Sequence, residues 1–578
     1  MAFSVPSESP AIIVKEVDLS GYVPNVQSTT GAYVGNFRWG PVEEATLVST
    51  EAGLVSLFGA PSTDEATDFI SAAYFLKYSS SLQIVRAVDA SAVNAYDASA
   101  ASAPLVKNLQ NFTNQDATLA DSDHTFIARY PGELGNSISV SVCPYSATNS
   151  TFDNWTYTGS FDAAPNTSDF AASVSATHDE VHVAVIDRLG VFSGTRGTVL
   201  ETFSYVSLGS NAKTSNGTSN YIKDVVNNGS RYIWMSGFGT NKFNDAAGTA
   251  ADTNVDFGDD NNYSAAALDV TLAAGVNSGT LGTSEVLAGF DHFEDKDTIQ
   301  VDFLIAPGMA ARIDQTTIVN DLITTAQSLR KDCIVISSPA RSDIINNSAP
   351  VTSTVATVNT FTNSSYLVVD NNYIKVYDKY NDRYVYIPAA SSTAGIMAAT
   401  DLNAAPWYSP AGARRGQYLG ITALSYSPTK AERDTLYKAG VNPIANLPGQ
   451  GVLLFGDKTK LNRPSAFDRI NVRRLFIVLE RAIALAARNT MFEFNDEFTR
   501  AEFVSIVEPF LREVQGRRGI TDFRVVCDET NNPGSVIDRN EFVANIFIKP
   551  ARSINYITLN FVAVRTGVDF EEIAGLAV

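Results

Sequence analysis

The spacing of apolar residues predicts helices and strands in different proportions along the 578-residue chain. Residues 64–78 and 315–330 carry apolar side chains three and four positions apart, which is typical of amphipathic helices. The apolar runs "VDFLIAP" and "CIVISSP" flank the second of these helices and predict buried strands, so this region forms a strand, helix, strand unit of an α/β core. We expect its inward helical stripe to consist of Ile318, Leu322, Ile323, Ala326 and Leu329.

Residues 126–303 show a different pattern, with short alternating runs separated by Gly, Asn and Ser loops. This pattern predicts a β-rich region, in which "EVHVAVIDR" and "TVLETFSYVSL" form a hairpin. The preceding stretch "DASAVNAYDASAASAP" is rich in Ala and Ser and contains no clear period. We therefore expect residues 89–125 to be a linker.

The carboxyl-terminal part carries the strongest helical signals, followed by three strand-like runs. Ser465 with Asp468, and Thr499 with Glu502, are spaced as capping boxes ahead of two apolar-faced helices. Pro509 should kink or shorten the second helix, because proline lacks the amide proton that a helix interior uses. The strand-like runs are "TDFRVVCD", "EFVANIFIKP" and "INYITLNFVAV".

Both ends of the chain contain strand-like segments that have no evident partner. The stretch "SPAIIVKEVDLSGYVP" near the start and residues 553–564 near the end alternate like strands, yet terminal segments fray unless something holds them. The sequence leaves two interpretations open for residues 553–564: an edge strand of its own domain, or a strand that pairs with another copy of the chain.

The balance of charge argues against some classes of partner. The net charge of −20 disfavours direct binding to nucleic acid or to an anionic membrane. From Lys430 onward the chain carries 20 Lys and Arg against 19 Asp and Glu, so the acidity lies upstream. Three widely separated cysteines suggest no disulfide framework, and no uncharged apolar run reaches the 18 residues typical of a membrane span.

Short motifs that imitate chemical sites are better explained as ordinary structure. "GVLLFGDKT" places Asp457 where a phosphate loop needs Gly next to Lys, so we interpret it as a strand that ends in a turn. In "HDEVH" we expect His178 and His182 to be neutral on one exposed strand face, and Asp252 begins a calcium-like loop that lacks the turn glycine. We therefore expect no catalytic residues, no metal, no cofactor and no enzymatic activity.

Longer motifs resemble a known family over nearly the whole chain. "FDRINVRRLF", "YDKYNDRYVYIP" and "RVVCDETNNPGSVIDRNEFVANIFIKPARSINYITLNF" closely resemble the contractile tail sheath protein of T4-like bacteriophages, the myovirus tail sheath family. "GNFRWGPVEEATLV", "LFGAP", "IVRAVD" and "YPGELGNSI" resemble the amino-terminal half of the same family. Longer members carry an additional outer domain between the last two motifs, which is expected to be absent here.

The resemblance implies a multidomain α+β and α/β fold with a conserved inner α+β domain, a middle α/β domain and an outer β-rich domain. The expected parts are an amino-terminal arm at 1–23, the middle domain at 24–88 and 304–429, a linker in place of an outermost domain at 89–125, the outer β-rich domain at 126–303, and the inner domain with a carboxyl-terminal arm at 430–578.

The resemblance also implies a structural role in the virion. Subunits of this family polymerise as stacked hexameric rings around an inner tail tube in a metastable extended state, and contraction drives the tube through the host envelope. The implied partners are other copies of the chain, the tube protein, and baseplate and tail terminator proteins, with assembly in the host cytoplasm. The alternatives are the sheath of a related machine, such as an R-type bacteriocin or a type VI secretion-like system, and a carboxylate-dependent α/β enzyme.

Three groups of residues follow as candidate contacts between subunits. In the family the terminal arms add strands to a small sheet of neighbouring subunits, which here predicts Ile12, Ile13, Val14, Val17, Ile554, Tyr556, Ile557, Leu559 and Phe561 as exchanged residues. The expected acceptor residues are Phe542, Ile546 and Ile548. Candidate tube-facing residues are Arg469, Arg473, Arg474 and Arg481, for which a solvated helix face with pairs to Glu480 or Asp468 is the alternative.

Overall fold

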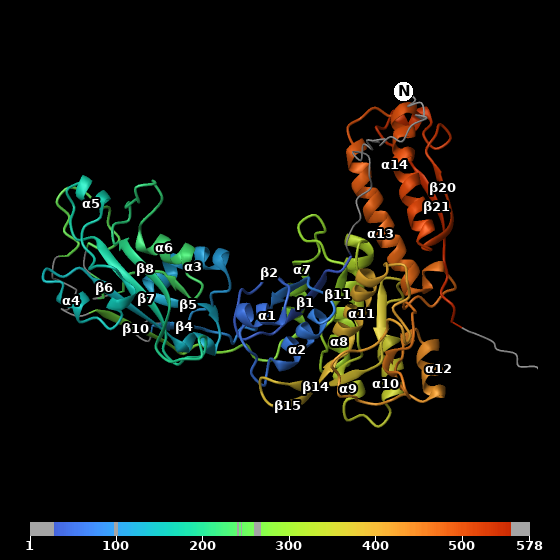
Figure 1. Cartoon of the computed structure of the whole chain (residues 1–578), viewed down its shortest axis with the longest axis horizontal. Helices are drawn as coiled ribbons and strands as arrows, with labels where there is room; N and C mark the ends of the chain where they lie inside the picture. The colour runs from blue at the N-terminus through green and yellow to red at the C-terminus, as the bar shows by residue number, and fades with distance from the viewer. Residues whose placement is uncertain (1–27, 98–101, 240–241, 244–245, 259–266, 556–578) are drawn as a thin grey trace, which may run out of the picture. The chain divides into compact units, whose positions relative to one another are not determined.

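The computed structural model describes residues 28–97, 102–239, 242–243, 246–258 and 267–555 (Figure 1). The chain divides into two compact units, which are described separately: Val23–Asn489, and Met1–Tyr22 with Thr490–Val578. Because the division follows Asn489, residues 430–489 belong with the preceding chain. The predicted inner domain at 430–578 is therefore not one compact unit.

A mixed sheet forms the core of the larger unit. Within the described residues it has seven strands in the order β17-β13-β12-β11-β1-β3-β2, all parallel to their neighbours except β2, which is antiparallel to β3. Its strands are β1 Gly31–Gly35, β2 Ala45–Val48, β3 Leu82–Arg86, β11 Phe303–Ile305, β12 Ile334–Ser337, β13 Leu367–Asp370 and β17 Val441–Asn442. Residues on both sides of the β-rich insertion thus share one sheet.

Helices cover both faces of this sheet, because alternate residues of its parallel strands are apolar on both sides. Tyr33 and Ile84 pack on one face with α1 Glu51–Phe58, α2 Ala66–Leu76, α11 Ala390–Asn403 and α13 Ile470–Ala487. Val34 and Val85 pack on the other with α7 Thr283–Asp291, α8 Arg312–Thr324, α10 Pro350–Val358 and α12 Lys430–Lys438. The strand, helix, strand prediction is confirmed, since β11 and β12 pair in parallel around α8.

One member of the predicted helical stripe was wrong. Ile318, Leu322, Ile323 and Ala326 are buried, but Leu329 is 51% exposed and Arg330 is buried instead. The chain changes from α8 to a π-helical turn, η3 Thr325–Arg330, and the wider turn rotates the following residues away from the 3.6-residue stripe.

A second sheet gathers the β-rich residues of the larger unit. In the described chain its order is β8-β7-β6-β10-β4-β5-β9, and each neighbouring pair is antiparallel. The predicted hairpin is confirmed by the pairing of β7 with β8. The strands are β4 Asn94–Asp97, β5 Phe126–Pro131, β6 Ile138–Pro144, β7 Glu180–Asp187, β8 Thr198–Ser207, β9 Ile233–Met235 and β10 Leu268–Ala273.

The linker prediction for residues 89–125 was wrong for part of that stretch. It contains β4, which lies inside the second sheet, and the helix α3 Leu109–Asp121. Asn94 is fully buried, and its side-chain amide donates to the carbonyls of Val106 and Ala128. The apolar pattern did not predict this strand because its residues are mostly small or polar. The buried side-chain amide is stable there because it bonds backbone carbonyls.

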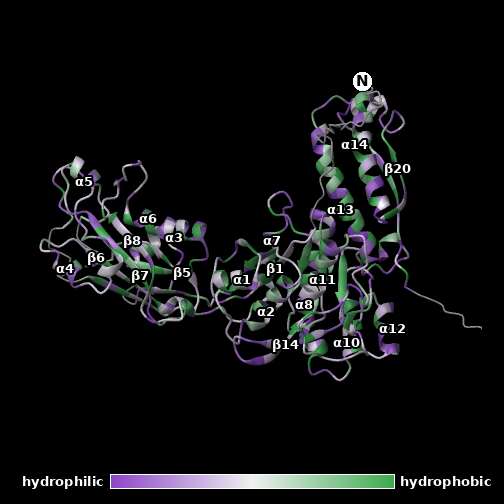
Figure 2. Cartoon of the chain, in the orientation of Figure 1, coloured by the Kyte–Doolittle hydropathy of each residue, from purple (hydrophilic) through white to green (hydrophobic). Residues whose placement is uncertain are grey.

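Smaller elements complete the larger unit. Two small sheets comprise β14 Tyr373–Asp378, β15 Arg383–Pro388 and β16 Ala423–Leu424, and β18 Ile444–Leu447 with β19 Gly451–Leu454. The remaining helices are η1 Glu133–Ser137, α4 Ser150–Asp153, η2 Thr158–Ser160, α5 Asp169–Ser173, α6 Ile222–Gly229, α9 Arg341–Ile344 and η4 Ala466–Asp468. Figure 2 shows hydrophobic residues in green around α8 and α11 of this unit.

The capping box predicted at Ser465 was wrong in position. Ser465 caps the short helix η4 by accepting from the amide of Phe467, and α13 begins only at Ile470. Arg469 separates the two helices in an extended conformation.

The smaller unit, from Thr490 to Asn555 in its described part, is a helix packed on a hairpin. It contains α14 Glu497–Gly516, β20 Ile520–Val526, α15 Gly534–Ile537 and β21 Asn545–Pro550, and η5 Arg488–Thr490 precedes it. Asp496 caps α14 by accepting from the amide of Thr499, so the predicted capping box at Thr499 lies inside the helix. Pro509 does not shorten α14, which continues to Gly516.

Candidate functional site

The hairpin of the smaller unit presents open strand edges. β20 and β21 pair antiparallel, with Phe523 opposite Ile548 and Val525 opposite Ile546, and form a two-stranded sheet within the described residues. α14 packs against β20. Two-stranded hairpins are only marginally stable in water, so a third strand on either edge would add ladder hydrogen bonds.

The predicted acceptor residues are only partly in this hairpin. Ile546 and Ile548 lie in β21 and are half-buried. Phe542 precedes the strand and packs edge-on against Phe503 of α14, with ring centres 5.4 Å apart, so its assignment to an acceptor strand was wrong. The chain stays out of the ladder there because Asn532 bonds both the amide and the carbonyl of Val543.

The predicted exchanged residues remain predictions. Ile12, Ile13, Val14, Val17, Tyr556, Ile557, Leu559 and Phe561 lie outside the described residues. Ile554 is described, and it is 80% exposed with no regular secondary structure.

An exposed aromatic loop in the same unit was missed by sequence reasoning. Phe492, Phe494 and Phe498 are at least three-quarters exposed, and Phe492 has a φ of 73°. Asn495 holds the loop by donating to the carbonyl of Glu541 at 2.8 Å. The signal in the sequence was the run "MFEFNDEF", whose apolar residues follow no helical or strand period. Such exposed apolar surface is typical of protein contacts.

The four candidate tube-facing arginines are engaged within the larger unit. Arg469 donates to Asp457 at 3.0 Å and to the hydroxyl of Tyr437. Arg473 is 7% exposed and lies over the rings of Phe467 and Tyr366 at 4.0 and 4.3 Å.

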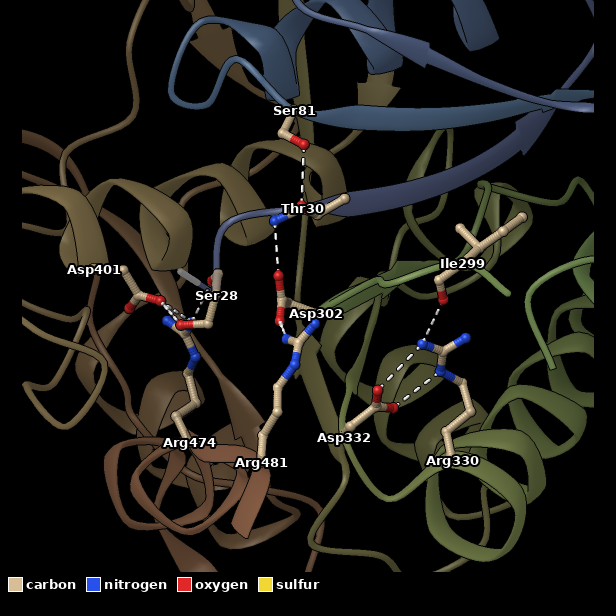
Figure 3. Close-up of polar contacts among 10 residues, drawn as sticks. All are labelled: Ser28, Thr30, Ser81, Ile299, Asp302, Arg330, Asp332, Asp401, Arg474 and Arg481. Carbon is tan, nitrogen blue, oxygen red and sulfur yellow. Dashed lines mark hydrogen bonds and ion pairs between the residues drawn. The ribbon is translucent and has the colours of Figure 1, made fainter. Parts of the chain in front are cut away.

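Arg474 is buried and the side chain of Arg481 is 10% exposed, and they form ion pairs with Asp401 and Asp302 (Figure 3). The tube-facing prediction was therefore wrong for Arg473, Arg474 and Arg481, and Arg469 is only partly accessible. The solvated-face alternative is confirmed in part for Arg469, which pairs with Asp468 at 3.6 Å, and was wrong for the other three arginines. Helical periodicity located Arg473, Arg474 and Arg481 on α13 but could not show that other elements cover these side chains.

The rejected chemical motifs are structural. Asp457 follows β19 and is buried against Arg469, which agrees with a strand that ends in a turn. His182 is fully buried in β7, where it accepts from the amide of Tyr205, so the exposed-face interpretation was wrong. Burial lowers the pKa of His182, which keeps the ring neutral. His178 precedes β7 and bonds Asp256 at 2.8 Å.

The described chain holds no group of three His, Cys, Asp or Glu side chains placed to bind a metal ion. The thiols of Cys143, Cys333 and Cys527 are all buried and unpaired with one another. Among the helices that the structure describes, none is both long and apolar enough to span a bilayer.

Asp370, the last residue of β13, is a fully buried carboxyl group that neutral donors surround. It accepts from the hydroxyls of Ser338 at 2.8 Å and Thr393 at 3.0 Å. Burial raises the pKa of Asp370 to about 7, because desolvation outweighs these hydrogen bonds.

We expect this group to make stability fall as pH rises from about 4 to 7. The folded protein retains the proton in that window while the unfolded chain releases it, so the slope of unfolding free energy against pH is negative. Asp370→Asn should remove this component and stabilise the protein at pH 8 by on the order of 2–4 kcal/mol. Urea unfolding from pH 4 to 8 checks this, and an equal slope in both proteins would contradict it.

Comparison with known proteins identifies the family. Residues 279–460 match the phage tail sheath protein central domain, and residues 462–563 match the phage tail sheath C-terminal domain. The tail sheath protein of Vibrio phage KVP40 is 32% identical over 705 aligned positions, covering 98% of this chain and 99% of that protein. That of Enterobacteria phage T4 is 31% identical over 670 positions, covering 98% and 99%.

A solved structure agrees in fold. The sheath tail protein from Listeria innocua superposes with a TM-score of 0.54 at 12% sequence identity, covering 91% of this chain and 93% of that one. Together with the sequence relatives, which match nearly from end to end at over 30% identity, this places the chain in the phage tail sheath protein family.

Proposed function

We propose that this chain is the structural subunit of a contractile phage tail sheath. It polymerises as stacked hexameric rings around an inner tail tube, is held in a metastable extended state, and contracts to drive the tube through the host envelope. The observation that carries the proposal is the hairpin β20–β21, which has no third strand among the described residues, in a chain of the tail sheath family.

Strand exchange supplies the contact between subunits. Residues 12–17 and 554–561 of neighbouring copies would add to the edges of β20 and β21, with alternate side chains filling pockets that set the register. At roughly 0.5–1.5 kcal/mol net per hydrogen bond, about five or six bonds stabilise each link by on the order of 3–9 kcal/mol. Each subunit both gives and receives arms, so the links form a continuous mesh.

Other surfaces support an assembly role. The exposed side chains of Phe492, Phe494 and Phe498 give the smaller unit apolar surface that a polymer would bury. The tube protein, the baseplate and the tail terminator are the further partners we propose, with assembly in the host cytoplasm and a final place in the virion. We propose no catalytic role.

The chain is shorter than the two phage relatives. The alignments with the two phage relatives run over 705 and 670 positions, more than the 578 residues here, so those relatives carry residues that this chain lacks. We propose that the missing residues form an outermost domain inserted between β4 and α3.

Electron microscopy of the purified full-length protein tests the function. We expect tubular or ring-stacked polymers at raised protein concentration, because the arms and their acceptor edges reside in one chain. Sedimentation velocity gives the matching solution measurement. A protein that stays monomeric at all concentrations and in the presence of the tube protein would overturn the proposal.

A further inference from the structure

The three residues that lead into the central sheet are held by an unusual density of contacts. Ser28, Thr29 and Thr30 directly precede β1, and they follow the predicted exchange arm. The carbonyl of Thr29 accepts from the hydroxyl of Ser79 at 2.8 Å. The hydroxyl of Thr30 lies 3.0 Å from that of Ser81, so the turn that precedes β3 holds one side of this segment (Figure 3).

Two arginines of α13 hold the other side. Arg474 donates to the carbonyl of Ser28 at 3.0 Å and pairs with Asp401 of α11, to which the hydroxyl of Ser28 also donates. Ser28, Arg474 and the side chain of Asp401 are each at most 5% exposed. Ser28, Arg474 and Asp401 are thus each bonded to the other two in a buried cluster.

Two turns further along α13, a second ion pair repeats the arrangement. Arg481 donates to Asp302 at 2.6 Å, and the other oxygen of Asp302 accepts from the amide of Thr30 at 2.9 Å. A spacing of seven residues places Arg474 and Arg481 on one side of the helix, about 10 Å apart along its axis. Two points of the same short segment are thereby tied to one rigid element.

We propose that Arg474 and Arg481 are positioning residues that clamp the root of the amino-terminal arm, so that tension on residues 1–27 passes into α13 and the central sheet. This rests on the proposed function, in which a neighbouring subunit holds the arm. Without the clamp, tension on the arm would detach residues 28–30 from the sheet before the tension reached β1.

The position of α13 in the chain gives the clamp a second consequence. The helix ends at Ala487, and the unit that contains the acceptor hairpin begins at Thr490. Helix α13 is therefore bonded to residues 28–30, at the root of the arm that the subunit gives. The same helix is covalently joined to the unit whose hairpin receives an arm. In this proposal α13 is the element through which tension passes from one subunit to the next.

Hydrogen exchange of the full-length protein tests the clamp directly. In Arg474→Met with Asp401→Leu, apolar groups of similar size replace the ion pair, a change that other buried pairs tolerate well. We expect exchange of the amides of residues 29–31 to accelerate at least tenfold, while the strands β11 and β12 keep their protection. Arg481→Met with Asp302→Leu tests the second tie independently and should act on the amide of Thr30.

A matched control separates a clamp from general destabilisation. Arg330 pairs with Asp332 and donates to the carbonyl of Ile299, and these contacts involve none of residues 28–30 (Figure 3). Arg330→Met with Asp332→Leu should lower overall stability without selective acceleration at residues 29–31. Unchanged exchange at these amides in both clamp variants, or equal acceleration in the control, would overturn the proposal.

Shearing of assembled tubes tests the mechanical consequence. Tubes of either clamp variant should assemble and then break to less than half the length of sheared wild-type tubes, while control tubes keep their length. Equal lengths of clamp-variant and wild-type tubes after shearing would show that the clamp does not transmit tension. If the wild type forms no tubes, the proposed function fails, and the exchange experiment still decides whether the clamp holds the arm root.

Discussion

A chain that ends at Arg552 is expected to fold as a stable monomer and to form no tubes. The removed segment begins after β21, which ends at Pro550, and after Ala551, whose amide donates to the carbonyl of Gly519 at 3.1 Å. Of the described residues removed, Ile554 is 80% exposed and belongs to no core cluster. The loss should therefore fall on assembly, because the strand given to the neighbour is missing.

Circular dichroism and thermal unfolding measure the fold of this truncated chain, and electron microscopy measures assembly. The matched control ends at Arg565, which keeps the predicted strand at residues 553–564 and should still form tubes. An unfolded product would show that the segment is part of the subunit's own core. Tubes of normal length would show that the segment is not needed for assembly.

Single substitutions sharpen the same test. Leu559→Asp places a charge at a predicted pocket-filling position, whereas Asn560→Asp places it on the opposite strand face. We expect the first to abolish tubes and the second to preserve them.

Replacing Arg86 should produce the largest loss of stability in the larger unit. This side chain is fully buried at the end of β3, and it donates to the carbonyls of Phe37, Gly40 and Pro131 at 2.7, 2.9 and 2.7 Å. All three acceptors are neutral backbone groups. The guanidinium thus bonds the loop at Phe37 and Gly40 and the end of β5 at once.

Arg86→Met keeps a similar volume but leaves three buried carbonyls without their donor. At about 1–3 kcal/mol for each unsatisfied group, and with some relaxation, we expect a loss of about 3–5 kcal/mol in the free energy of unfolding. Guanidinium chloride unfolding checks this. The control is Arg414→Met, since Arg414 is exposed and should change stability by less than about 0.5 kcal/mol. A loss below 1 kcal/mol at Arg86 would contradict the expectation.

Helix α8 shows how far local patterns reach. Its apolar spacing correctly placed Ile318, Leu322 and Ile323 in the core, because a regular helix turns the same angle at every residue. The spacing failed at Leu329, where the helix widens into a π-turn and exposes the side chain. A change of helical pitch leaves no signature in hydrophobicity.

In the acceptor hairpin, too, the apolar pattern predicted part of the structure correctly and part of it wrongly. Alternation placed Ile546 and Ile548 in a strand, as the structure has them. It also extended the strand to Phe542, whose ring packs on α14 instead. Asn532 decides this boundary through two hydrogen bonds, and nothing in the apolar pattern marks it.

The sequence by itself determined the local elements and the family, because helical and strand periods and long motifs are properties of neighbouring residues. It predicted the α/β core, the β7–β8 hairpin and the resemblance to tail sheath proteins. Only the tertiary structure decided the partners of the arginines of α13. Arg474 and Ser28 lie 446 positions apart, so whether that helix face meets solvent, a tube or the chain's own arm root depends on which distant elements fold against it.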